Sequence, residues 1–223
     1  MNPSPAPEPT SDEPALSIHL RDRTGPAHQD AERRLFNRSL ARGELTTADW
    51  RRHLEQHLIL HRALELRIDQ LARESPRWLE GLAGPERRRV PDLAADLAAL
   101  AGNPAAAPLA PTAAAAAAIA RAPAAEVVGY LYVLEGSTNG GRFLVRSARR
   151  FLGTPPESRD GLRFLDPYGE EQPERWRGFR EALDRLERTE PETAAIVAGA
   201  ERMFHWVASI ADAVWAARAE PAA

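Results

Sequence analysis

Residues 126–152 read EVVGYLYVLEGSTNGGRFLVRSARRFL and form the longest apolar-faced segment of the chain. Apolar side chains recur along it at helical spacing, which predicts one long helix. Gly136, Gly140 and Gly141 lie inside this helix, and each costs about 0.5 to 1 kcal/mol relative to alanine. Tyr132, Gly136 and Gly140 follow at intervals of four residues and therefore share one helix face. A cost of this size calls for a physical reason.

A helix face of bare backbone has two explanations. It lets a flat or bulky ligand approach the main chain, and it lets the helix bend over that ligand. It also lets a second helix pack closely, and spacing alone favours this explanation. A phosphate-binding loop fits less well, because the glycines lie within the helix and no lysine follows them.

The rest of the chain is also predicted to be helical. Ala, Leu, Arg and Glu dominate from Ala15 onward, and alternating patterns of β-branched residues are scarce. Further helices are expected over residues 16–42 with an interruption at 24–26, and over 47–72, 91–101, 112–122, 174–188 and 192–218. Residues 155–169 are expected to form a loop. The sequence therefore predicts an all-α fold without a sheet.

Length and composition suggest one domain with a terminal extension. The chain has 223 residues, which fits a single domain somewhat above the usual size of about 150. Residues 1–14 hold five prolines among small and acidic residues, a composition that buries too little apolar surface to fold. We therefore expect a disordered Pro-rich tail over residues 1–15 and a helical domain over 16–219.

The side-chain inventory argues against several kinds of site and partner. There is no cysteine, which excludes disulfides, thiolate metal sites and cysteine nucleophiles. The 29 basic residues are outnumbered by 32 acidic ones and form no stripe with aromatic residues, so no nucleic-acid partner is expected. The longest apolar run, 113–120, falls short of the roughly 18 residues of a membrane span, and no secretion signal is visible. We expect a cytoplasmic protein without a membrane anchor.

Two groups of histidines are candidate ligands. Glu32 follows His28 by four residues, which on a helix places a carboxylate beside the imidazole and suits an oriented metal ligand such as the axial ligand of haem. Spacing alone favours an ordinary histidine with an acidic neighbour. His53, His57 and His61 recur every four residues beside an apolar stripe and could contribute metal ligands, but we interpret them as residues at the boundary of the core.

Several motifs of the chain resemble those of haem oxygenases. TGPAHQDAE at residues 24–32 resembles the proximal-helix motif of that family, and GYLYVLEGSTNGGR at 129–142 resembles the distal-helix motif of its bacterial branch. LAADL at 93–97 and DPYG at 166–169 also resemble bacterial members, many of which are tied to bacteriophytochromes. The resemblance spans about residues 20–217. It implies a single-domain helical bundle that holds haem b between the first helix and the glycine-bearing helix, as substrate and cofactor.

The resemblance assigns roles on both faces of the haem. His28 matches the axial iron ligand, and Glu32 matches the carboxylate that hydrogen-bonds to it. Gly136, Gly140 and Gly141 match the glycines that lie over the distal face, where backbone can approach bound oxygen. This match supplies a reason for the cost of the glycines.

Further residues match contacts to the haem edge and the distal pocket. Arg21 and Tyr132 match residues that bind a propionate, and Arg177 or Arg180 could supply another basic contact from a late helix. Ser137 stands where the animal enzymes carry an aspartate that organises distal water. Proton delivery would then depend on a water network without that carboxylate.

The activity implied by the resemblance is cleavage of haem with oxygen and reducing equivalents to biliverdin, carbon monoxide and ferrous iron. The chain carries no flavin or iron–sulfur motif, so a ferredoxin, flavodoxin or flavin reductase is expected to supply electrons, and a bacteriophytochrome is a possible recipient of biliverdin. Two alternatives stay open. Ser137 and Asn139 are compatible with a catalytically silent haem- or tetrapyrrole-binding protein of the same fold, and the row of three histidines hints at a non-haem di-iron oxygenase.

Overall fold

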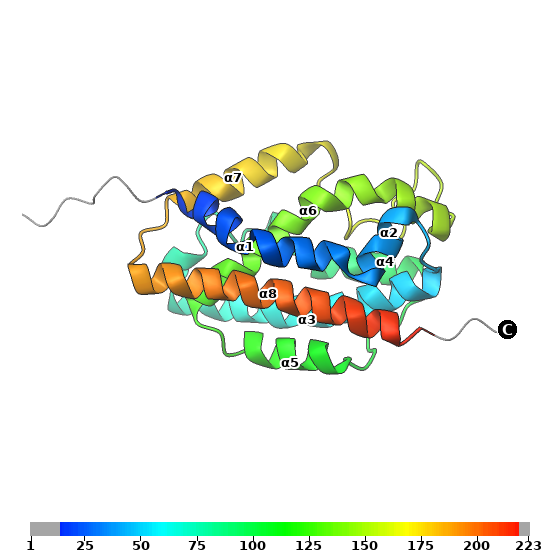
Figure 1. The fold of residues 1–223 in the computed structure, drawn as a ribbon, viewed down its shortest axis with the longest axis horizontal. Helices are drawn as coiled ribbons and strands as arrows, with labels where there is room; N and C mark the ends of the chain where they lie inside the picture. Colours follow the sequence, from blue (N-terminus) through cyan, green and yellow to red (C-terminus); the bar gives the residue numbers. More distant parts are fainter. Residues whose placement is uncertain (1–13, 219–223) are drawn as a thin grey trace, which may run out of the picture.

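A computed structural model describes residues 14–218, which form a bundle of α-helices (Figure 1). The helices are α1 (Leu16–Arg33), α2 (Leu35–Arg42), α3 (Thr47–Glu74), α4 (Val90–Ala99), α5 (Ala110–Ile119), α6 (Ala124–Leu152), α7 (Gln172–Asp184) and α8 (Glu190–Ala216), with 3₁₀ turns η1 (Pro76–Trp78), η2 (Pro85–Arg87) and η3 (Gly169–Glu171). No strand occurs among these residues, which confirms the predicted all-α class.

The predicted terminal tail lies almost entirely outside the described residues. Only Pro14 and Ala15 of that segment are described, and both are exposed and precede α1. Residue 219, the predicted end of the domain, is also outside. Within residues 14–218, every helix is either too short or too polar to span a lipid bilayer.

Three long helices form the centre of the bundle. α6 and α8 share the most extensive helix contact, while α1 packs along α8 on one side and α3 contacts α8, α4 and α5 on the other (Figure 1). The predicted bounds of these helices agree with the structure to about one turn. α3 and α8 both begin with a capping box, formed by Thr46 with Asp49 and by Thr189 with Glu192. In each, the threonine hydroxyl accepts a hydrogen bond from the backbone amide of the acidic residue, whose carboxylate accepts one from the threonine backbone amide.

The N-terminal helix is interrupted at a different place from the one predicted. α1 runs unbroken through residues 24–26, because the Thr24 hydroxyl donates to the Leu20 carbonyl one turn back, at 2.7 Å, and does not cap a new helix. The break falls at Arg34, whose backbone is extended and whose guanidinium donates to Asp212 of α8 at 2.8 Å. A partner far away in the sequence therefore fixes the end of α1.

α6 and α8 cross at their glycines. A Cβ atom on Gly129 would lie 2.1 Å from the Ile196 carbonyl oxygen, and one on Gly199 would lie 2.4 Å from the Glu126 carbonyl oxygen. Real Cβ atoms do not approach backbone so closely, so glycine is required at both positions. This crossing fixes the first half of α6 against α8.

The segment between α6 and α7 lacks regular helix until η3, as predicted for residues 155–169, and is tied to the bundle by polar side chains. Asp96 of α4 is fully buried and accepts hydrogen bonds from the backbone amides of Arg163 and Phe164, at 3.1 and 2.9 Å. The Trp50 indole of α3 donates to the Gly161 carbonyl at 2.8 Å. These bonds tie the segment to α3 and α4.

Candidate functional site

One cavity of about 890 Å³ lies between α1 and α6 and reaches the inward face of α3. Its walls include eight of the residues predicted for the site, which are Arg21, His28, Glu32, Tyr132, Gly136, Ser137, Gly140 and Gly141. Phe204, Val207 and Ala211 of α8 also line it. The structure therefore gathers residues from two motifs far apart in the sequence around a single space.

The His28 imidazole stands on the α1 wall with 56% of its side chain exposed. Its Nδ1 lies 3.8 Å from Glu32 Oε1, which is longer than a hydrogen bond but close enough for the carboxylate to orient the ring. Phe204 packs edge-to-face against the ring at 5.7 Å. With Nδ1 turned to Glu32, Nε2 is the nitrogen left to act as a metal ligand.

Tyr132 and Arg21 lie where α1 faces the first half of α6. The Tyr132 ring is 8% exposed and lies beside Trp176 of α7, and burial raises the pKa of its hydroxyl. The Arg21 guanidinium is exposed, and its Nε donates to Asp22 at 3.0 Å. One buried phenol and one exposed cation are suitable partners for a carboxylate at the rim of the cavity.

The three glycines singled out in α6 have different surroundings. A Cβ on Gly140 would meet nothing within 4 Å, and a Cβ on Gly136 would make ordinary contact with Trp176 at 3.5 Å. A Cβ on Gly141 would lie 2.0 Å from the Leu165 carbonyl oxygen. Close packing thus explains Gly141, whereas no neighbour among residues 14–218 requires a glycine at 136 or 140.

Ser137 lies between these glycines and uses its hydroxyl locally. Its Oγ donates to the Leu134 carbonyl at 2.7 Å, and the residue is exposed. Because this hydroxyl already donates its proton within its own helix, it is poorly placed to donate a hydrogen bond to water in the cavity.

The two arginines of α7 are not equivalent. Neither lines the cavity, but the Arg180 guanidinium lies 6.0 Å from the ring of Trp176, which does. Arg177 instead pairs with Glu174 and Glu181 along the outer surface of α7, at 3.4 and 3.9 Å. Arg180 is therefore the nearer of the two to the site.

The histidine row of α3 is buried, so the interpretation of His53, His57 and His61 as boundary residues is wrong. Their exposed fractions are 9%, 6% and 4%. The row is covered because Phe36 of α2 stacks on His53 and Phe164 packs against the other two. No group of three or more His, Asp or Glu side chains within residues 14–218 is arranged to hold a metal ion, so nothing there supports a di-iron site.

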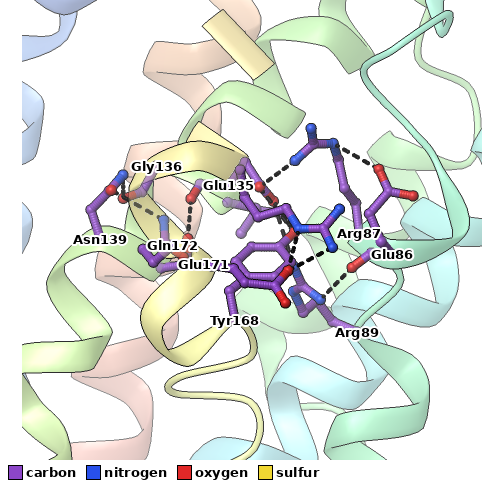
Figure 2. Close-up of polar contacts among 12 residues, drawn as sticks. Glu86, Arg87, Arg89, Glu135, Gly136, Asn139, Tyr168, Glu171 and Gln172 are labelled. Carbon is purple, nitrogen blue, oxygen red and sulfur yellow. Dashed lines mark hydrogen bonds and ion pairs between the residues drawn. The ribbon is translucent and has the colours of Figure 1, made fainter. Parts of the chain in front are cut away.

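A buried polar cluster around Glu135, which also borders the cavity, was not predicted. The Glu135 carboxylate, 5% exposed, accepts hydrogen bonds from Arg87 at 2.5 Å and from the Tyr168 hydroxyl at 2.9 Å (Figure 2). Arg89 Nη2 lies 3.6 Å from the same carboxylate and its guanidinium covers the Tyr168 ring at 4.5 Å. Burial beside Glu135 raises the pKa of Tyr168 to about 12.

A second set of contacts joins α7 to the turn of α6 that contains Gly136 and Gly140. The Gln172 amide donates to Asn139 Oδ1, and the Asn139 amide donates to the Gly136 carbonyl, both at 3.1 Å (Figure 2). The only sequence signal for the Glu135 cluster and these contacts is Glu135 itself, a charged residue next to Gly136 in an otherwise apolar stretch. Its partners come from segments that no local pattern connects.

Comparisons with a family model and with a curated relative identify the same family. A family model described as "Heme oxygenase" matches residues 14–212. A protein named "Heme oxygenase" from Xanthomonas campestris pv. campestris (strain 8004) is 32% identical over 169 residues, which cover 74% of this chain and 90% of the relative.

Solved structures show the same fold. The heme oxygenase from Leptospira interrogans superposes with a TM-score of 0.80 at 24% identity, covering 89% of this chain and 99% of that one. Heme oxygenase-1 from the cyanobacterium Synechocystis sp. PCC6803, solved in complex with heme, gives a TM-score of 0.79 at 20% identity and covers 89% of this chain and 91% of that one.

Proposed function

The chain belongs to the haem oxygenase family, and from that premise we propose that it binds haem b between α1 and α6 and cleaves it to biliverdin, carbon monoxide and ferrous iron. The activity requires oxygen and external electrons. We include a ferredoxin, flavodoxin or flavin reductase as the electron donor, because the sequence has no flavin or iron–sulfur motif of its own. A bacteriophytochrome that receives biliverdin is the partner suggested by the likeness of the motifs to bacterial members.

The bare face of α6 is the observation that carries this proposal. Gly136 and Gly140 line the cavity opposite His28, and neither glycine is demanded by a protein neighbour. A flat macrocycle lying against the helix backbone supplies the missing reason, since any larger side chain would enter the space that the ligand needs. The same cavity is of the usual volume for a cofactor site.

His28 is the proposed iron ligand. Its Nε2 can bind iron while the Glu32 carboxylate lies beside Nδ1, 3.8 Å away, where it favours the tautomer with the proton on Nδ1 and raises the basicity of the ligand. Phe204 limits rotation of the ring from the α8 side. Bound haem would supply the iron that binds oxygen and the meso carbon that is oxidised.

Side chains at the cavity rim set the orientation of the haem. We assign the propionates to Arg21, Tyr132 and Arg180, and we rank Arg177 below Arg180 because its guanidinium is engaged with two glutamates of its own helix. These contacts would determine the orientation of the haem in the cavity. Gly136 and Gly140 would leave room for haem and oxygen against the helix backbone, while Ser137 contributes small size more than hydrogen bonding.

Titration with hemin tests the proposal. Wild type is compared with His28→Ala and with His205→Ala, a control at an exposed histidine of α8 outside the cavity. We expect a stoichiometric Soret band in wild type and control that decays to a biliverdin spectrum when a reductant is added in air. The His28 variant should lose turnover.

Three outcomes would contradict the proposal or part of it. Unchanged biliverdin yield in His28→Ala would remove that residue as the iron ligand. A stable Soret band in wild type that does not decay would indicate a silent haem-binding protein. No Soret band at all would exclude haem as the ligand.

A further inference from the structure

Three consecutive side chains of α6 donate hydrogen bonds to the backbone of their own helix. They belong to Ser137, Thr138 and Asn139, and each bonds the carbonyl three residues earlier in the chain, at 2.7, 2.6 and 3.1 Å. In a regular helix the same carbonyls also accept the backbone amides four residues later. Sharing the acceptor weakens the ladder of backbone bonds and lets a helix bend. α6 is therefore easiest to bend at the turn that borders the cavity.

Asn139 is the one of these three side chains that also bonds another element within residues 14–218. Its Oδ1 accepts a hydrogen bond from the Gln172 amide of α7 at 3.1 Å, while its Nδ2 donates to the Gly136 carbonyl (Figure 2). The side chain is thus held at both ends. Through it, the Gly136 carbonyl is tied to α7.

The start of α7 is also tied to α6 one residue before Gly136. The Tyr168 hydroxyl donates to Glu135 at 2.9 Å, and Gln172 follows Tyr168 by four residues just as Asn139 follows Glu135 (Figure 2). Two ties with the same spacing on both segments therefore span residues 135–139 of α6. With both in place, this turn has little freedom to bend.

Gln172 occupies a position where packing alone would favour an apolar residue. It is 1% exposed, and its Oε1 is buried without a hydrogen-bond partner among residues 14–218. A leucine of similar size would fill the same space and leave no unpaired oxygen. The bond to Asn139 is therefore the feature that explains a buried amide here.

The same face of α7 continues to the haem cavity. Trp176 follows Gln172 by one turn, lines the cavity, and lies 3.5 Å from the position of a Cβ on Gly136. One turn further along, the Arg180 guanidinium lies 6.0 Å from the Trp176 ring. One side of α7 thus contacts the bare turn of α6 and extends toward the rim to which we assign a propionate.

We propose that Gln172 and Asn139 position the wall of the haem site formed by α6. Gln172 holds Asn139 on the Gly136 carbonyl, and this sets how far α6 bends over the bound haem. Neither residue lines the cavity, so both act through the backbone of α6. The role toward haem rests on the proposed function, whereas the tie between the two helices is a property of the chain without ligand.

The first test measures hydrogen exchange of backbone amides in the protein without haem. Gln172→Leu removes the donor, and Asn139→Ser keeps a hydroxyl that can bond its own helix but cannot reach Gln172. Gln70→Leu makes the first change at an exposed position of α3 outside the cavity. We expect exchange over residues 134–143 to be about 3- to 10-fold faster in the first two variants and unchanged in the control.

A purely structural role for Gln172 predicts a different pattern. We expect the urea midpoint of Gln172→Leu to equal or exceed that of wild type, because the unpaired buried oxygen is gone. The double variant should exchange no faster over residues 134–143 than either single variant, since both remove the same tie. A lower midpoint together with faster exchange in every helix would overturn the proposal.

The second test uses the haem complex, reduced and saturated with carbon monoxide. The infrared C–O stretch reports the groups around the ligand, so we expect one narrow band in wild type and in Gln70→Leu. Gln172→Leu and Asn139→Ser should give a broader band or a second one. We also expect hemin to dissociate about 3- to 10-fold faster from these two variants.

The outcomes separate the tie from the activity. Unchanged exchange over residues 134–143 in both variants would overturn the tie, and wild-type infrared bands in both would overturn the positioning role even if wild type degrades haem. If wild type binds no haem, the proposed function fails, whereas the exchange measurement still decides whether Gln172 holds α6. Should one variant fail to fold, the other carries the comparison.

Discussion

The two sides of α6 differ in almost every physical respect. Toward α1 the helix presents backbone at Gly136 and Gly140, with open space around the second glycine. Toward the interior, Glu135 is fixed by charged partners and Gly141 touches the carbonyl of Leu165. The rear contacts hold the helix in place, so its front needs no side chains to anchor it. Bare backbone can therefore face a ligand without loss of order.

The largest expected effect comes from the charge cluster behind the helix. Glu135→Gln removes the buried carboxylate shared by Arg87 and Arg89 and leaves them only the longer ion pairs with Glu86 and Asp92, at 3.6 and 3.7 Å. This should lower the free energy of unfolding by about 3 to 5 kcal/mol. Urea denaturation measures this, with Glu174→Gln, an exposed glutamate of α7, as a control expected to change by less than about 0.5 kcal/mol. A loss below about 1 kcal/mol for Glu135→Gln would show that the cluster does not anchor α6.

Tyr168 should show an intermediate effect that depends on pH. Its hydroxyl donates to Glu135, so Tyr168→Phe should cost about 1.5 to 3 kcal/mol near neutral pH. The folded state raises the pKa of this phenol from 10 to about 12, so its contribution is complete below pH 10 and is lost as pH rises toward 12. Stability measured from pH 9 to 12 should therefore fall less steeply in the variant. Parallel curves would contradict this.

The next comparison concerns Gly141 on the closed side. Gly141→Ala places a methyl group against the Leu165 carbonyl, which should cost about 1 to 3 kcal/mol through displaced backbone. Thermal unfolding of apo protein checks the sign. A variant as stable as wild type would mean that the backbone around Leu165 moves away from the new methyl group at no cost in free energy.

The smallest change is expected at Gly140 on the open side, and it should have the opposite sign. Gly140→Ala meets no neighbour and gains helix propensity, which should raise stability by up to about 1 kcal/mol. The same methyl group enters the cavity, so hemin affinity should fall. Lower stability together with unchanged hemin binding would reverse our interpretation of the two sides.

Much of the helical architecture was predictable because local patterns determine it. Apolar spacing located α3 and α8 to within about a turn, and the structure adds the threonine caps at which both helices begin. The cleft was predictable from the motifs around His28 and Gly136, which the fold brings to opposite walls.

The unpredicted features all depend on partners distant in the sequence. The break at Arg34 is set by Asp212, and the burial of His57 by Phe164. Gly140 and Gly141 are identical residues one position apart, yet only the fold shows that one faces open space and the other a carbonyl oxygen. Local sequence cannot separate these cases.

The crossing of Gly129 with Gly199 fixes the position and rotation of α6 relative to α8, so it sets where the later residues of α6 lie. Gly136 follows Gly129 by seven positions, which on a helix corresponds to about 10.5 Å along the axis. Insertion of one residue between them would rotate everything that follows by about 100° and turn the bare face away from His28. The length of this interval is therefore as strictly constrained as the identity of the residues at its ends.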